Sequence, residues 1–150
     1  MKKLVLLSVL VITSIANLNA QSFEYKVITS VESIVPMGLG RSRIISSDEE
    51  RNYKDFTSLR SSESKKQNKS KRKDIKIEQF EETKLVNFYS IAGINFENIA
   101  SNDAVISSKI NTMISEGWDL AFVTSGVESD SGKGDGKGIF ITRFIFKRAK

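Results

Sequence analysis

Three arginines hold the positions in this sequence that point most directly to chemistry. Arg41 and Arg43 follow the only proline and alternate along strand-like sequence, so their side chains share one face. Arg143 interrupts a strand face that is rich in isoleucine. A guanidinium buried there must meet an acid, a carbonyl or a ligand, because an unpaired buried charge is strongly destabilising. Two interpretations follow: a structural ion pair with Glu32, Asp119 or another sheet carboxylate, or a small anion site or subunit contact.

A second group of cations is crowded between positions 65 and 73, with no acid among them. Its members are Lys65, Lys66, Lys69, Lys71, Arg72 and Lys73. Such a run could attract an acidic envelope polymer. No aromatic residue is interleaved for base stacking, so we expect no sequence-specific binding of nucleic acid. The alternative interpretation is a solvated loop whose charge is screened by salt.

The composition removes most catalytic classes. The chain has no histidine and no cysteine, which excludes Ser-His-Asp and Cys-His catalysis, thiol redox chemistry and ordinary zinc sites. Paired carboxylates about 5–9 Å apart could hydrolyse glycosides. The available acids, for which the sequence indicates no common geometry, are Asp119, Glu128, Asp130 and Asp135. We therefore expect no catalytic residue, no cofactor and no metal, and a protein that is not an enzyme.

The glycine-rich segment 127–137 invites phosphate-binding and calcium-binding interpretations, and both fail. Gly136-Lys137 lacks the Ser or Thr and the helix that follow in a phosphate loop. The acids of a calcium loop alternate and end in a glutamate, a spacing that Gly132 and Gly134 break. The segment predicts the tip of a long hairpin.

The first twenty residues predict export. Two lysines precede an apolar stretch from Leu4 to Ala16, and a small residue, Ala20, ends the segment. A helix of that length reaches about 20 Å, short of a bilayer core of roughly 30 Å. We expect residues 1–20 to be a signal peptide cleaved after Ala20, with cleavage after Ala16 as the alternative. The mature protein would then be periplasmic or secreted, with no membrane span.

The mature chain, 21–150, is long enough for one domain and has no disulfide to support it. Within it, 46–84 holds few apolar residues and many charged ones, 11 cations and 9 acids. Such a segment cannot bury enough apolar surface to offset the entropy lost on ordering. We interpret 46–84 as a polar, disordered insertion between two strands of a single α+β domain.

Strands and one helix must position these groups. Residues 23–31 alternate apolar and polar types as a half-buried strand does, and 85–94 is apolar on both faces, as in a central strand. Asn102 begins a helix whose apolar residues recur every three or four positions up to Glu116. Gly117 ends that helix in the left-handed conformation, and Trp118 folds back onto it.

Two further strands, 118–125 and 138–148, complete the expected fold. The last strand is apolar on both faces, so we expect it at the sheet centre or against a second subunit. The fold class is α+β: a small, three- to four-stranded, mainly antiparallel sheet with one amphipathic helix packed on one face. Because one helix covers only one face, the other needs a partner or the insertion to cover it.

Three short motifs resemble the small bacterial family called domain of unknown function 4177, and the longer blocks 30–36, 38–43 and 138–143 resemble its exported versions from Bacteroidetes-type bacteria. The motifs are Tyr25-Lys26-Val27, Glu116-Gly117-Trp118-Asp119-Leu120 and Arg143-Phe144-Ile145-Phe146-Lys147-Arg148. Asp119 stands where the family usually has glutamate. The resemblance covers Phe23–Ile45 and Leu85–Lys150. It implies a compact α+β fold and no catalytic residue.

These observations favour an exported binding or scaffold module that self-associates through its uncovered sheet face. One alternative is a carboxylate-dependent hydrolase of envelope polymers. Another is an adhesin that holds acidic polymers electrostatically through the cations from Lys65 to Lys73.

Overall fold

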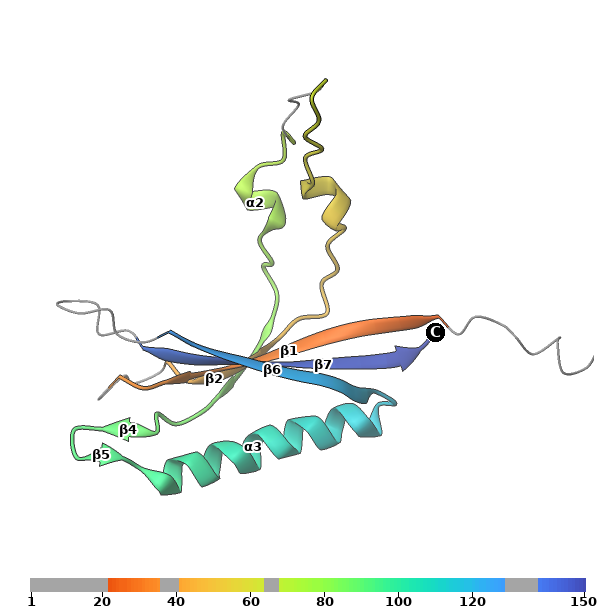
Figure 1. Ribbon diagram of the computed structural model, residues 1–150. Helices are drawn as coiled ribbons and strands as arrows, with labels where there is room; N and C mark the ends of the chain where they lie inside the picture. The colour runs from red at the N-terminus through yellow and green to blue at the C-terminus, as the bar shows by residue number, and fades with distance from the viewer. Residues whose placement is uncertain (1–21, 36–40, 64–67, 129–137) are drawn as a thin grey trace, which may run out of the picture.

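A computed structural model describes residues 22–35, 41–63, 68–128 and 138–150. Its described residues form a five-stranded sheet with one long helix on one face and a long arm on the other (Figure 1). The strand order is β3-β2-β1-β7-β6, and each neighbouring pair is antiparallel. The α+β class, the antiparallel sheet and the single main helix are confirmed, but the sheet has five strands and not three or four.

The elements follow the chain in a simple order. They are β1 (Phe23–Ser33), β2 (Arg43–Ser46), the 3-10 turn η1 (Tyr53–Phe56), α2 (Arg72–Ile75), β3 (Glu81–Lys84), β4 (Tyr89–Ser90), β5 (Gly93–Ile94), α3 (Phe96–Ser115), β6 (Asp119–Glu128) and β7 (Ile139–Ala149). The first and last strands, β1 and β7, pair along their whole length at the sheet centre. Beyond them, the Lys150 amide donates to the Ser22 carbonyl at 2.9 Å.

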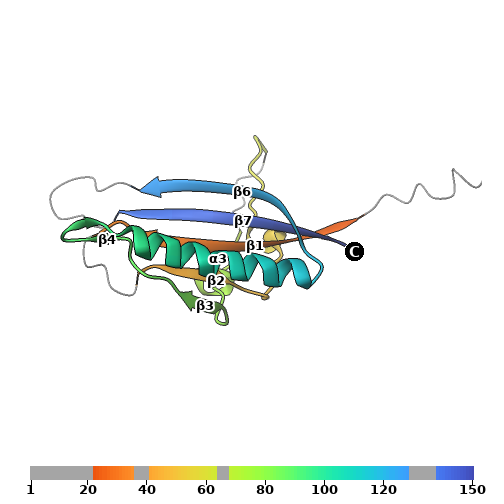
Figure 2. The ribbon, with the colours of Figure 1, turned by 90° about the horizontal axis from the view of Figure 1, so that it is seen from below.

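The core lies between α3 and alternate residues of the central strands. Its buried apolar side chains are Ile28, Ile44, Leu85, Met113, Trp118 and Phe146, with Ile106, Ile110 and Phe144 packed against them. Seen from the helix side, α3 runs across β1 and β2, whereas β6 lies at the far edge beyond β7 (Figure 2). Residues at the intervening positions of the strands therefore face away from the helix.

The C-terminal end of α3 agrees with the sequence prediction. Gly117 has a φ of +86°, and its amide donates to the Ile114 carbonyl at 3.0 Å. The Trp118 amide returns to the Met113 carbonyl at 3.0 Å, which completes the glycine-terminated cap. The Trp118 ring is buried, and the Arg148 guanidinium lies 4.3 Å from its centre.

The N-terminal end of α3 lies earlier than the sequence predicts. Asn95, whose side chain accepts from the Asn98 amide, caps the helix, and Phe96 is its first residue. The prediction that Asn102 begins the helix is wrong. Asn102 lies within the helix and its side chain is buried. The side chain forms hydrogen bonds with residues far away in the sequence, which local sequence does not reveal.

The Asn102 side chain joins three separate segments. It is 1% exposed, and its Oδ1 accepts from the Val86 amide at 2.8 Å. Its Nδ2 donates to the Val86 carbonyl at 2.8 Å and to Glu32 Oε1 at 2.9 Å. One amide side chain therefore fixes α3 both to β1 and to the segment that follows β3.

The same contact explains why 85–94 is not the central strand that its apolar residues predict. Asn102 occupies both backbone groups of Val86, which a neighbouring strand would otherwise use. Leu85 is buried, but the chain then leaves the main sheet and forms the small β4–β5 hairpin before α3. The prediction for this segment is wrong.

The predicted insertion also begins and ends differently from its expected bounds. Ser46 belongs to β2, and Glu81–Lys84 forms β3 and pairs with β2. The polar insertion is therefore 47–80, and the strands on either side of it are direct neighbours in the sheet.

The Asn102 bridge generates a stability prediction. Asn102→Ala should lower the free energy of unfolding by about 2 kcal/mol, because the Val86 amide and carbonyl lose their partner beneath the helix. Urea unfolding followed by circular dichroism measures the change. Asn111→Ala, at an exposed position of the same helix, is the matched control and should stay within about 0.5 kcal/mol of wild type. Equal midpoints for the two variants would refute the role assigned to Asn102.

Candidate binding surfaces

The three predicted arginines do not form one site. Arg41 precedes β2 and is exposed. Arg43 lies in β2 and pairs with Glu82 of β3 at 2.7 Å, so its partner is another sheet carboxylate and not Glu32 or Asp119. Arg143 lies in β7 and is exposed, so the expectation of a buried guanidinium that needs a partner is wrong.

The sheet register nevertheless brings two of these arginines to one face. Arg43 is opposite Val31 and Arg143 is opposite Thr29, so both lie beside β1 at positions that point away from α3. On its other side Arg143 is opposite Thr124 of β6. The isoleucines on this face of β7 are half-buried, whereas Arg143 among them is exposed beside β6, the sheet's outer strand.

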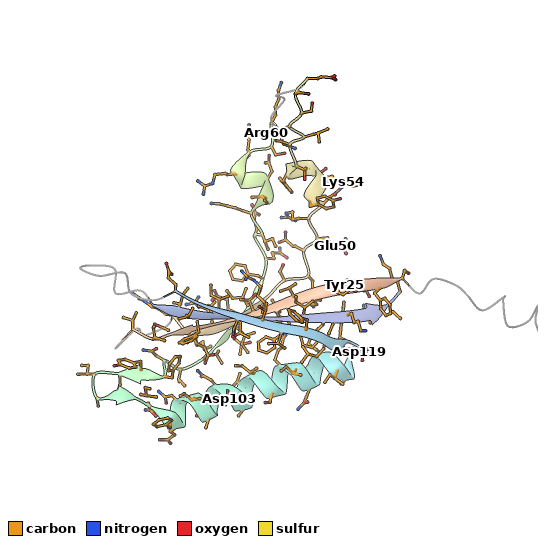
Figure 3. The ribbon with its side chains drawn as sticks, in the orientation of Figure 1. Tyr25, Glu50, Lys54, Arg60, Asp103 and Asp119 are labelled. Atoms are coloured by element: carbon orange, nitrogen blue, oxygen red, sulfur yellow. The ribbon has the colours of Figure 1, made fainter. Side chains whose placement is uncertain are left out.

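An apolar surface, here called the open face, lies on the side of the sheet opposite α3. It consists of Tyr25, Val27, Phe122 and Ile145. Ile145 of β7 is opposite Val27 on one side and Phe122 on the other, so three strands form one continuous row. Tyr25 is 64% exposed, Phe122 61% and Val27 45%. Figure 3 shows Tyr25 on the same side of the sheet as the arm.

The open face continues into a groove at the foot of the arm. The groove has a volume of about 970 Å³, and its sheet side includes Tyr25, Val27, Thr29 and Ile45. Its arm side includes the first residues of the insertion and Ile77. The arm and the open face therefore form one concave, partly apolar surface.

Strand β6 is exposed along its whole length. All ten of its residues are exposed, and among the described residues it pairs with β7 alone. From Leu120 to Val127 it carries no charge and no proline. Natural proteins usually protect a sheet edge with such residues. The sequence predicted this strand but not its edge position, because strand order depends on pairing between distant segments.

The arm, residues 47–80, is attached to the body through acids at its base. Asp48 forms an ion pair with Lys26 of β1. Next to the arm, Glu81 of β3 pairs with Lys109 of α3 at 2.8 Å. The two contacts join the foot of the insertion to the sheet and to the helix.

Hydrogen bonds also join the two limbs of the arm to one another. The Glu49 carboxylate accepts from the Gln79 amide at 2.7 Å, and the Ser47 hydroxyl donates to the Gln79 carbonyl at 3.1 Å. Arg51 donates to the Lys76 carbonyl at 2.9 Å. The described part of the insertion therefore has a defined path away from the sheet.

Three carboxyl groups at this base have lowered pKa values. The hydrogen bond and charge of Lys26 lower the pKa of Asp48. The Gln79 amide, followed by Arg51, lowers the pKa of Glu49. Hydrogen bonds from Lys109 and Ser46 lower the pKa of Glu81. All three acids are therefore held in the charged form that attaches the arm.

The predicted cation run lies in the outer part of the arm. Lys69, Lys71, Arg72 and Lys73 are exposed around α2 on the second limb. Lys65 and Lys66 lie outside the described residues. Thus the structure places four of the six cations together.

The candidate catalytic acids are not brought together. Asp119 and Glu128 stand at the two ends of β6, which puts them roughly 30 Å apart at about 3.4 Å per residue. Asp130 and Asp135 lie outside the described residues. In the described part of the chain, no group of three or more acids is placed to hold a metal ion.

No protein-family model, curated protein or solved structure matches this chain. Membership of domain of unknown function 4177 stays a prediction from the sequence motifs. The predicted signal peptide, 1–20, lies outside the described residues. None of the helices that the structure describes is long and apolar enough to cross a membrane.

The lowered pKa values predict that acid detaches the arm. Because the folded-state pKa values lie below the unfolded ones, the contacts stabilise the arm above a pH of about 4.5 and lose this effect as the pH falls through the folded-state values. Hydrogen-exchange protection of the Gln79 amide, corrected for intrinsic rates, should fall between pH 6 and pH 3. The β1–β7 amides should stay protected.

A control separates this effect from general acid unfolding. Asp48→Asn and Glu81→Gln together should lower protection at the arm base already at pH 6 and reduce its dependence on pH. Since the pairs are exposed, 1 M salt at pH 6 should act in the same direction. Protection at Gln79 that is equal at pH 6 and pH 3 would contradict the assignment.

Proposed function

We propose that this chain is an exported binding module that self-associates through the open face. The observation that carries the proposal is the row Val27–Ile145–Phe122, which crosses three strands opposite α3 and is exposed at both ends. Because Phe122 is 61% exposed and Val27 45%, a partner that covered either side chain would gain about 1 kcal/mol or more at each. Aromatic residues such as Tyr25 and Phe122 are typical anchors of protein interfaces.

The charges around the open face favour a second copy as the partner. Arg143 and Lys147 of β7 lie on either side of Ile145, and both point away from α3. Asp119 and Glu128 stand at the ends of β6 on the same face. A two-fold arrangement, in which the same surface meets itself, can place the acids of one copy against the cations of the other.

The arm limits how the two copies approach. It leaves the sheet between β2 and β3, at the opposite edge from β6. Two sheets pack face to face about 10 Å apart, and the groove at the arm's foot occupies the side of the face formed by β1 and β2. The second copy would therefore lie over β7 and β6, with the two arms at the outside of the pair.

The export part of the proposal rests on the sequence of residues 1–20. The hydrolase alternative receives no support from Asp119 and Glu128, since a ten-residue strand separates them. The adhesin alternative depends on the arm and not on the open face.

Phe122→Lys tests self-association. The mature chain should form dimers in sedimentation velocity, and the variant should dissociate with a Kd at least about tenfold higher, because a lysine in the apolar row must lose water on association. Lysine is well tolerated on an exposed edge strand, so the variant should fold. Ile91→Lys, at an exposed turn between β4 and β5, is the matched control and should dimerise as wild type does. A wild-type chain that is monomeric at high concentration would overturn the proposal.

A further inference from the structure

The arm separates its charges along its length. The whole insertion, 47–80, carries ten cations and seven acids, and four of these acids gather where it meets the sheet: Asp48, Glu49, Glu50 and Glu78, next to Glu81 and Glu82 of β3. The outer arm, here 51–63 and 68–76, carries eight cations and three acids. Figure 3 shows Glu50 nearest the sheet, Lys54 further out and Arg60 furthest along the same limb.

The two limbs of the outer arm form an open cleft of about 330 Å³. Asn68 holds the limbs together. Its side-chain Nδ2 donates to the Asp55 carbonyl at 2.6 Å, and its backbone amide donates to Ser58 Oγ at 2.6 Å. The cleft is lined by Phe56, Ser58, Arg60, Asn68, Ser70, Lys71, Arg72 and Ile75. Three cations and no acid thus surround one concave surface.

The cations of the cleft are available to a ligand. Within the described residues, Arg60, Lys71 and Arg72 form no ion pair. The nearby acid Asp74 is already engaged, since its carboxylate accepts from the Lys71 backbone amide at 2.9 Å. Arginine presents a planar array of donors that matches a sulfate or phosphate group with two parallel hydrogen bonds.

We propose that the outer arm binds an anionic polysaccharide, with sulfate or phosphate groups held by Arg60, Lys71 and Arg72. Phe56 and Ile75 supply an apolar floor on which the carbon–hydrogen face of a sugar ring packs. The hydroxyl groups of Ser58 and Ser70 lie in the same lining and suit sugar hydroxyls. The acids at the base repel the same polymer, which confines it to the outer arm and leaves the open face free.

The site is independent of self-association. It lies on the arm, whereas the open face lies on β1, β7 and β6. A chain that is strictly monomeric should therefore still bind the polymer, and the failure of either proposal leaves the other standing.

The test uses the mature chain and a short heparin oligosaccharide as the sulfated probe, measured by titration calorimetry at low salt. Wild type should bind, and its affinity should fall as salt is raised. The double variant Arg60→Gln, Arg72→Gln should weaken binding about tenfold or more, since it removes both guanidinium groups of the cleft. Urea midpoints should be unchanged, because both residues are exposed and outside the core.

A matched control and a second ligand distinguish the proposal from simple charge attraction. Lys84→Gln, Lys150→Gln removes the same charge outside the arm and should change affinity less than about twofold. Equal losses in the two double variants, or no binding by wild type, would overturn the proposal. A single-stranded DNA oligomer of equal charge that binds more tightly than heparin would overturn the assignment to a polysaccharide.

Discussion

The sheet has five strands, but the single long helix is wide enough to cover only part of one face. The rest of the structure depends on this difference in width between helix and sheet. The helix α3 crosses β1 and β2, so a packed core exists only there, and six apolar side chains are buried among the described residues. On the opposite face the described chain covers only the part beside the arm's foot, and β6 is left exposed. Because apolar burial is the main favourable term in folding, a domain built in this way has a small core and a large surface on which apolar groups remain in contact with water.

The position of α3 depends on a polar contact more than on its amphipathic pattern. Its apolar residues recur at helical spacing, but the contacts of Asn102 with Val86 and Glu32 set where the helix lies on the sheet. Asn102 is 70 residues from Glu32, so no local pattern reveals this contact. The C-terminal end of α3 could be predicted from the sequence, because Gly117 ends the helix through contacts with neighbouring residues only. Its beginning could not, because a buried asparagine has the same local signature as a capping one.

The candidate surfaces, like the helix, could be predicted from the sequence only in part. The two apolar faces of β7 and the single helix were enough to predict an uncovered face. The alternation along β1 was misleading, because Tyr25 and Val27 belong to its apolar set but face away from α3. The exposure of Arg143 and of β6 was not predictable, since it follows from which strand ends the sheet. Charge composition concealed the arm as well: an insertion of mixed charge becomes an acidic foot and a basic outer part only when its two limbs lie side by side. The summed charge of a segment does not show how its charged residues are arranged in the folded protein.

The central pair of strands, β1 and β7, is made of the two ends of the described chain. Their pairing closes a loop of more than a hundred residues, the slowest kind of contact for a folding chain to find. A chain that leaves its site of synthesis amino end first cannot complete this sheet until its last residues are free. Until β7 is free, β1 has no partner on that side and the centre of the sheet stays open.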